Sequence, residues 1–90
     1  MEEKITIPKT IEEAIQFLDK ELSEDDKKYI VKHGAISVHH SLGRWIRNNW
    51  GFWEEDKNDI VKCLVDMGFT HPDYMSTYII EMFVKYITKN

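Results

Sequence analysis

The chain has 90 residues, of which 42% are hydrophobic, and a formal net charge of −4 at pH 7. This length suits a single domain over residues 1–90, with a modest core that would gain from self-association. The negative charge argues against general nucleic-acid binding, which favours a basic domain. No segment is apolar for long enough to cross a bilayer, and the N-terminus lacks a signal peptide. The single cysteine fits a reducing compartment, so we expect a cytoplasmic protein.

The first two predicted helices have clear start signals. Thr10 and Glu13 have the spacing of a capping box, and an apolar stripe follows them to Leu22. Ser23 begins the second helix with three acidic residues in its first turn, which suits the helix dipole, and Gly34 ends it. Residues 5–7, which precede these helices, could form a short extended segment.

Three more helices follow along the chain. The third runs from Ser37 to Asn49, and the fourth begins near residues 54–56 and stops at Gly68. Pro72 suits the first turn of the fifth helix, with His71 as its cap. Strand signals are nearly absent. The sequence therefore predicts an all-α fold, a compact bundle of about five short helices.

Residues 27–53 have an unusual composition for this chain. The window contains none of the 16 acidic residues, but five of the 12 Lys and Arg, three of the four His and all three Trp. Its formal charge is +5, against −9 for the remainder. Both arginines, Arg44 and Arg47, lie here, and the planar donor fork of arginine matches phosphate or carboxylate. The window therefore predicts a surface that binds an anionic ligand.

The third helix orders these residues by face. At about 100° per residue, Val38, Leu42 and Ile46 share the core side, while His39, Gly43 and Arg47 share a neighbouring side. Some further candidates lie next to this side of the helix, and others follow the helix in the chain. The complete candidate ligand-binding set is His39, His40, Gly43, Arg44, Arg47, Asn48, Trp50 and Trp53.

Each of these residues also has a structural interpretation. Gly43 costs about 1 kcal/mol in mid-helix, so either a closely packed helix or a ligand needs the missing side chain. A ligand there predicts that Gly43→Ala stays folded and loses binding. Arg47 could pair with the acidic run 54–56 or with helix-end carbonyls, and Arg44 could be solvated. Trp50 and Trp53 could wall a pocket or belong to the core or an interface.

The sequence offers no constellation for catalysis. His40 and Ser41 are neighbours and point in different directions on a helix, and Cys63 lies among apolar residues. Paired histidines at a metal-binding spacing are missing, and no Gly-rich phosphate loop occurs. We therefore expect a protein that is not an enzyme and needs no cofactor and no metal.

Much of the chain resembles a known but uncharacterised family of small bacterial and phage proteins. The resemblance rests on the signature His…Leu-Gly-x-Trp-Ile-Arg-Asn-x-aromatic-Gly-x-Trp, found here between His39 and Trp53. The Glu13-Ala14 helix start and the run His71-Pro72-Asp73-x-Met75-Ser76 are further marks. Arg44 and Tyr74 depart from the family pattern, so Arg44 would tune this protein rather than serve a family-wide site. The family has no known function, so the resemblance implies a helical fold alone.

Two functional classes remain. The first is a non-enzymatic binding protein for a phosphorylated small molecule, since the chain resembles small, oligomeric phage sponges that sequester nucleotide immune signals. The alternative is a protein-binding inhibitor or immunity-type module acting through a Trp- and Tyr-rich surface. Tyr74 and Tyr78 widen the apolar face of the last helix, which predicts a homo-oligomer.

Overall fold

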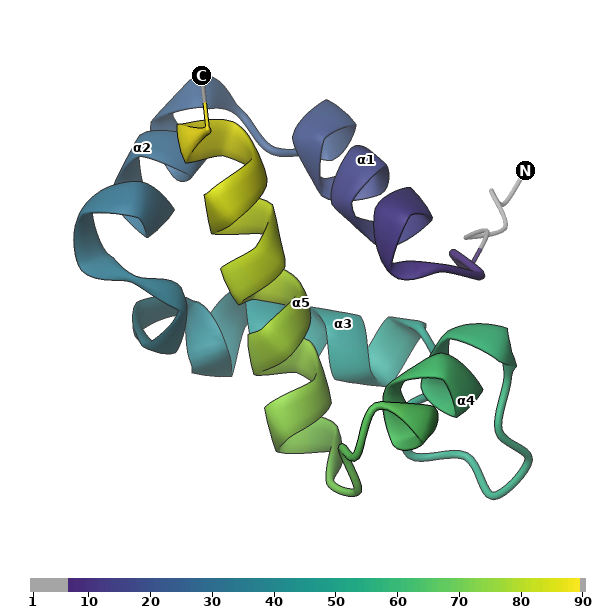
Figure 1. Cartoon of the computed structure of the whole chain (residues 1–90). Coiled ribbons are helices and arrows are strands. Elements are labelled where there is room, and N and C mark those ends of the chain that lie inside the picture. Colours follow the sequence, from purple (N-terminus) through teal and green to yellow (C-terminus); the bar gives the residue numbers. More distant parts are fainter. Residues whose placement is uncertain (1–6, 90) are drawn as a thin grey trace, which may run out of the picture.

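The longest helix, α5, forms the centre around which the rest of the chain packs (Figure 1). The computed structural model describes residues 7–89, and no strand occurs among them, so the all-α prediction is confirmed. Residues 5 and 6 of the predicted extended segment lie outside this range. The elements in chain order are α1 (Ile11–Glu21), α2 (Glu24–His33), the 3₁₀ turn η1 (Ala35–Val38), the π turn η2 (His39–Gly43), α3 (Arg44–Asn49), α4 (Asp59–Asp66) and α5 (Pro72–Thr88).

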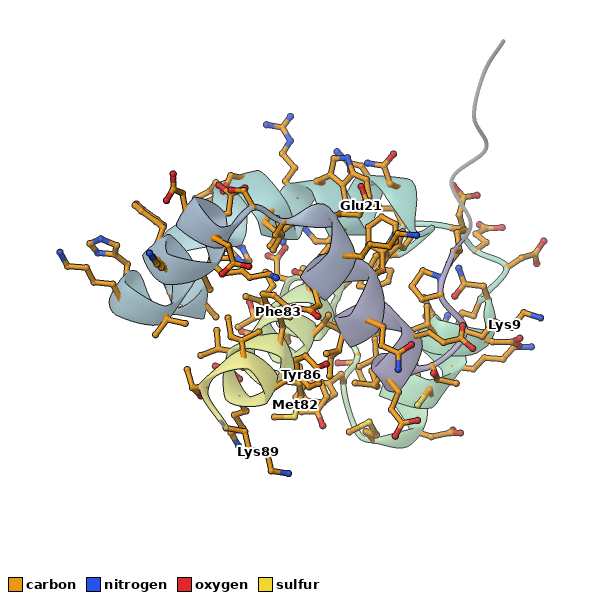
Figure 2. All side chains as sticks on the ribbon, turned by 90° about the horizontal axis from the view of Figure 1, so that it is seen from above. Lys9, Glu21, Met82, Phe83, Tyr86 and Lys89 are labelled. Carbon is orange, nitrogen blue, oxygen red and sulfur yellow. The ribbon has the colours of Figure 1, made fainter. Side chains whose placement is uncertain are left out.

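The core lies between α5 and the helices on either side of it. Ile79, Ile80 and Phe83 of α5 have no exposed surface, and neither do Ala14 of α1 and Ile46 of α3. Figure 2 shows Phe83 among the crowded side chains at the centre and Lys89 at the outer end of α5. The Cα radius of gyration is 12.7 Å, the size expected of a compact domain of this length.

The predicted starts of the first two helices are confirmed, with one change in the hydrogen bonds. The Thr10 hydroxyl accepts from the Glu13 amide at 3.1 Å, but the Glu13 carboxylate accepts from the amide of Lys9 rather than that of Thr10. Ser23 forms a complete capping box with Asp26. Both caps satisfy amides that the first helical turn leaves without partners.

A salt bridge ties α1 to α2. The Lys27 ammonium lies 2.8 Å from the Asp19 carboxylate and 3.4 Å from that of Glu24. The hydrogen bond that Lys27 donates to the Asp19 carboxylate raises the pKa of Lys27 above its ordinary value. Because this pKa is raised, the contribution of the bridge is complete at neutral pH and is lost only in strongly alkaline solution.

Residues 37–49 are helical throughout, as predicted, but the expectation of one regular α-helix over this range is wrong. The segment consists of three pieces, η1, η2 and α3, each with a different helical hydrogen-bond pattern. In η2 the carbonyl of His39 accepts a bond from the side chain of Arg47, and the hydroxyl of Ser41 donates to the carbonyl of Val38. Side-chain donors thus bond to two backbone carbonyls of the segment. The π turn between η1 and α3 has a wider hydrogen-bonded loop than an α-helix, so the segment is not one regular α-helix.

The predicted start of the fourth helix near residues 54–56 is also wrong. Gly51 reverses the chain with a positive φ of 72°, and α4 begins only after Asn58. The Asn58 side chain accepts from the Val61 amide at 3.1 Å and donates to the Trp50 carbonyl at 2.8 Å. Acidic residues favour a helix start through the dipole alone, whereas Asn58 satisfies an amide directly and anchors the loop as well.

Asn58→Ala should therefore destabilise the protein by about 1–2 kcal/mol, because it removes the cap of α4 and leaves the Trp50 carbonyl without its donor. The midpoint of urea unfolding measures the loss. Asn48→Ala, at an exposed position with no side-chain hydrogen bond among the described residues, is the matched control and should stay within about 0.5 kcal/mol. Equal midpoints for the two variants would contradict the role given to Asn58.

Candidate functional site

Arg47 is buried, and its guanidinium holds η2 and α3 against the start of α5. The residue is only 6% exposed. Nη1 donates to the Ser76 hydroxyl at 2.8 Å, and Nη2 donates to the His39 carbonyl at 3.2 Å. Nε lies 3.5 Å from the Asp73 carboxylate. The acidic partner of Arg47 is therefore Asp73 on α5 and not a residue of the run 54–56. The positive charge of Arg47 is paired with a carboxylate of the same chain.

Gly43 provides the space that this guanidinium occupies. A Cβ at position 43 would lie 3.0 Å from Nη1 of Arg47 and 3.5 Å from the Ser76 hydroxyl. Gly43 is buried, and the side chains of Arg47 and Ser76 fill the space beside it. This space is where a ligand would lie in one of the two interpretations of Gly43 drawn from the sequence. The helical cost of glycine, about 1 kcal/mol, is offset by close packing of η2 and α3 on α5.

Asp73 lies between two histidines as well as against Arg47. The His39 Nε2 atom is 3.8 Å from Asp73 Oδ1, and the His71 Nδ1 atom is 3.8 Å from Oδ2. His71 Nδ1 also accepts a hydrogen bond from the Asp73 amide at 3.0 Å, which confirms the predicted helix cap. One carboxylate at the start of α5 therefore faces an arginine and two imidazoles that come from separate parts of the chain.

Asp73 and the two histidines line a surface hollow of about 380 Å³. We call it the histidine hollow, because three of the four histidines line it. Its volume lies within the range of small-molecule sites, and most of its lining surface is apolar. The lining residues are Ile36, His39, His40, His71, Asp73, Tyr74 and Thr77.

The structure divides the predicted site residues into three groups. His39 and His40 line the histidine hollow, and Arg47 and Gly43 lie beneath it in the contact with α5. Arg44 and Asn48 are exposed and do not line the hollow.

The two remaining tryptophans have opposite environments. Trp50 is fully buried against Phe17, Trp45 and Phe52, so its ring belongs to the core, and its Nε1 has no hydrogen-bond partner in the described part of the chain. Trp53 is 57% exposed, with its ring centroid 6.2 Å from that of His71. Trp53 thus lies next to a residue of the histidine hollow without lining it.

Sequence reasoning missed the contribution of α5 to this site. Asp73 and Thr77 lie one turn apart on its first two turns, and Ser76 is the buried partner of Arg47. The available signal was the run His71-Pro72-Asp73-x-Met75-Ser76, which the family resemblance marked only as a helix start. The spacing of Asp73 with Ser76 and Thr77 also places all three near one face of a helix.

The polar groups of the hollow do not form a hydrogen-bonded triad in this structure. His39 Nδ1 shares a 3.3 Å hydrogen bond with the Thr77 hydroxyl, and its Nε2 faces Asp73, an order that superficially matches a hydroxyl–imidazole–carboxylate triad. The 3.8 Å separation is too long for a hydrogen bond, and Arg47 neutralises the same carboxylate oxygen. Asp73 therefore makes no hydrogen bond to the His39 imidazole in this structure. No group of three or more potential metal ligands occurs within residues 7–89.

The fold and the site define a small all-α domain with a hollow, lined by three histidines, at the start of its longest helix. Residues 7–87 match the family described as Domain of unknown function (DUF6794), and the chain belongs to this family. The match supports the predicted membership of an uncharacterised family. No curated protein and no solved structure matches the chain. Within the described residues, no helix is both long and apolar enough to span a membrane.

The contact between Gly43 and Arg47 predicts an interaction that a double-mutant cycle can measure. Gly43→Ala should destabilise the protein by about 1–3 kcal/mol, because Arg47 is held by three partners and moves only by weakening them. This outcome replaces the stable variant expected if a ligand lay against Gly43.

Arg47→Met keeps the side-chain stem and removes the guanidinium, so in that background Gly43→Ala should be neutral or stabilising by up to about 1 kcal/mol. Chemical unfolding of the four proteins gives the coupling energy. A cost for Gly43→Ala that is the same in both backgrounds would show that Arg47 is not what requires the glycine.

Proposed function

We propose that this protein is a non-enzymatic binding protein and that its ligand, a phosphorylated small molecule of the nucleotide class, occupies the histidine hollow. The observation that carries the proposal is the convergence of three imidazoles, the Tyr74 ring and Asp73 on one hollow, with the Asp73 carboxylate held by the buried Arg47. A carboxylate held in place before a ligand arrives reduces the entropic cost of binding.

The lining suggests how each part of a nucleotide would be recognised. The rings of Tyr74 and His71, with centroids 6.0 Å apart, offer aromatic surfaces on which a base can stack. Asp73 can accept a hydrogen bond from a base or sugar, and Thr77 can donate or accept one. The hollow has no Lys or Arg in its lining, so the phosphate contact falls to the histidines.

A role in sequestration follows from binding without turnover. In its more specific form, the proposal is a phage-type sponge that holds a nucleotide immune signal in the host cytoplasm, as the sequence resemblance suggests. Each copy would then remove one ligand molecule, so the protein would act in proportion to its concentration. This form also includes the predicted homo-oligomer.

A protein partner is the second candidate, and one observation favours it. Ile36 and Tyr74, which line the hollow, are 72% and 67% exposed, and the exposed ring of Trp53 lies next to His71. Exposed aromatic and aliphatic side chains grouped on one face are typical of protein interfaces. An inhibitor or immunity-type module would use this wider surface rather than the hollow alone.

His40→Ala should weaken nucleotide binding by about tenfold, because a hydrogen bond to a charged phosphate contributes about 1.5 kcal/mol or more. His40 is exposed, so the substitution should leave unfolding unchanged. Isothermal titration calorimetry with cyclic and ADP-ribose-type nucleotides, chosen after a thermal-shift screen, measures the effect.

Arg44→Ala is the matched control, since it removes a full positive charge from an exposed position outside the hollow and should change affinity less than twofold at moderate salt. Equal losses for Arg44→Ala and His40→Ala would place the ligand elsewhere. Absence of any nucleotide binding, together with loss of a protein partner in Tyr74→Ala, would favour the second candidate.

A further inference from the structure

We infer that this protein self-associates head to tail through two surfaces at opposite ends of the molecule. The first is an acidic knob made of residues 53–56, Trp53-Glu54-Glu55-Asp56. The second is a basic groove between α2 and the C-terminal end of α5. In the proposed contact, the acidic knob of one copy enters the basic groove of the next. The residues that line the groove are Glu24, Lys27, Lys28, Val31, Lys32, Ile87 and Thr88.

The basic groove combines an apolar base with unpaired positive charge. Its volume is about 330 Å³, and Val31 and Ile87 supply its apolar surface. Lys27 is neutralised by Asp19 and Glu24. Lys28 and Lys32 are exposed, and neither forms an ion pair with another residue of the described chain. The groove therefore favours an occupant with one apolar group and acidic neighbours.

The acidic knob has that chemistry. Trp53 is more than half exposed, and the three acidic residues after it are exposed and form no ion pairs within residues 7–89. The knob is also held in a defined place, because the Glu54 amide donates to the Gly51 carbonyl and Asn58 anchors the end of the loop. A fixed loop loses little conformational entropy when it docks.

The two surfaces cannot meet within one molecule. In Figure 1 the loop that precedes α4 lies at one end of the fold, and α2 with the end of α5 lies at the other. A contact between knob and groove therefore joins different copies. In the head-to-tail arrangement that we infer, each pair of copies shares one such contact, which leaves one knob and one groove free on every dimer. Growth continues until the rotation between copies closes a ring.

The association should be weak. One tryptophan and three acidic residues cover less area than a stable interface of about 1,200 Å² or more, so assembly should require protein concentrations of about 0.1–1 mM. It should also weaken as salt screens the exposed charges. This inference does not depend on the proposed ligand, because neither the knob nor the groove includes a residue that lines the histidine hollow.

Sedimentation equilibrium of the wild-type protein is the first test. The weight-average mass should exceed that of one chain, should pass that of two chains as concentration rises to about 1 mM, and should fall toward one chain in about 0.5 M salt. Trp53→Ala, which removes the apolar part of the knob, should lower the association constant at least tenfold. The double variant Lys28→Glu with Lys32→Glu should do the same by reversing the charge of the groove.

The double variant Lys9→Glu with Lys20→Glu is the matched control, because it changes the net charge equally at exposed positions that do not line the basic groove. It should assemble like the wild type. Circular dichroism spectra should be the same for all variants, since each substituted side chain lies at the surface.

A mixing experiment tests the head-to-tail geometry. Trp53→Ala keeps its groove, and the Lys28→Glu, Lys32→Glu variant keeps its knob, so an equimolar mixture has one working contact and should stop at one-to-one dimers. The inference is overturned by a wild type that stays monomeric at about 1 mM, by a wild type that stops at dimers, or by a mixture that gives no dimer.

Discussion

The ion pair between Arg47 and Asp73 is the interaction on which the rest of this structure depends. Arg47 is only 6% exposed, and Asp73 lies in the first turn of the longest helix. Together with the hydrogen bonds of Arg47, the ion pair joins α3, the π turn and α5. A buried guanidinium is stable only if its donors are satisfied, and here a carbonyl, a hydroxyl and a carboxylate satisfy it. That requirement explains why position 43 is glycine and why Ser76, a small polar residue, is fully buried in α5.

The fold was largely predictable because its signals are local. Capping residues, an N-terminal proline and helix-ending glycines each act within a few residues, so the class, the number of helices and most of their ends followed from sequence. The two errors both lie next to long-range contacts. The carbonyl of His39 bonds to a side chain eight residues away, and Asn58 bonds to the carbonyl of Trp50. Neither bond leaves a periodic pattern in the sequence.

The candidate site was predictable only on one of its two sides. The composition of residues 27–53 drew attention to His39, His40, Gly43 and Arg47, which the structure gathers at or beneath one hollow. Charge alone could not separate Arg47, whose charge is internal, from Arg44, whose charge faces water. Residues on α5 were missed because contact between segments 30 residues apart depends on how the helices pack, which a single sequence does not state.

One feature of α5 links the site to the stability of the helix itself. The ring nitrogen of His71 that accepts the Asp73 amide belongs to a residue that also walls the histidine hollow. A ligand or proton that takes this lone pair removes the acceptor from the first turn of the helix. The opening rate of that turn, seen as amide hydrogen exchange at Asp73, would then report occupancy of the hollow without any labelled ligand. The stability of the first turn of α5 would thus change when a ligand binds in the histidine hollow.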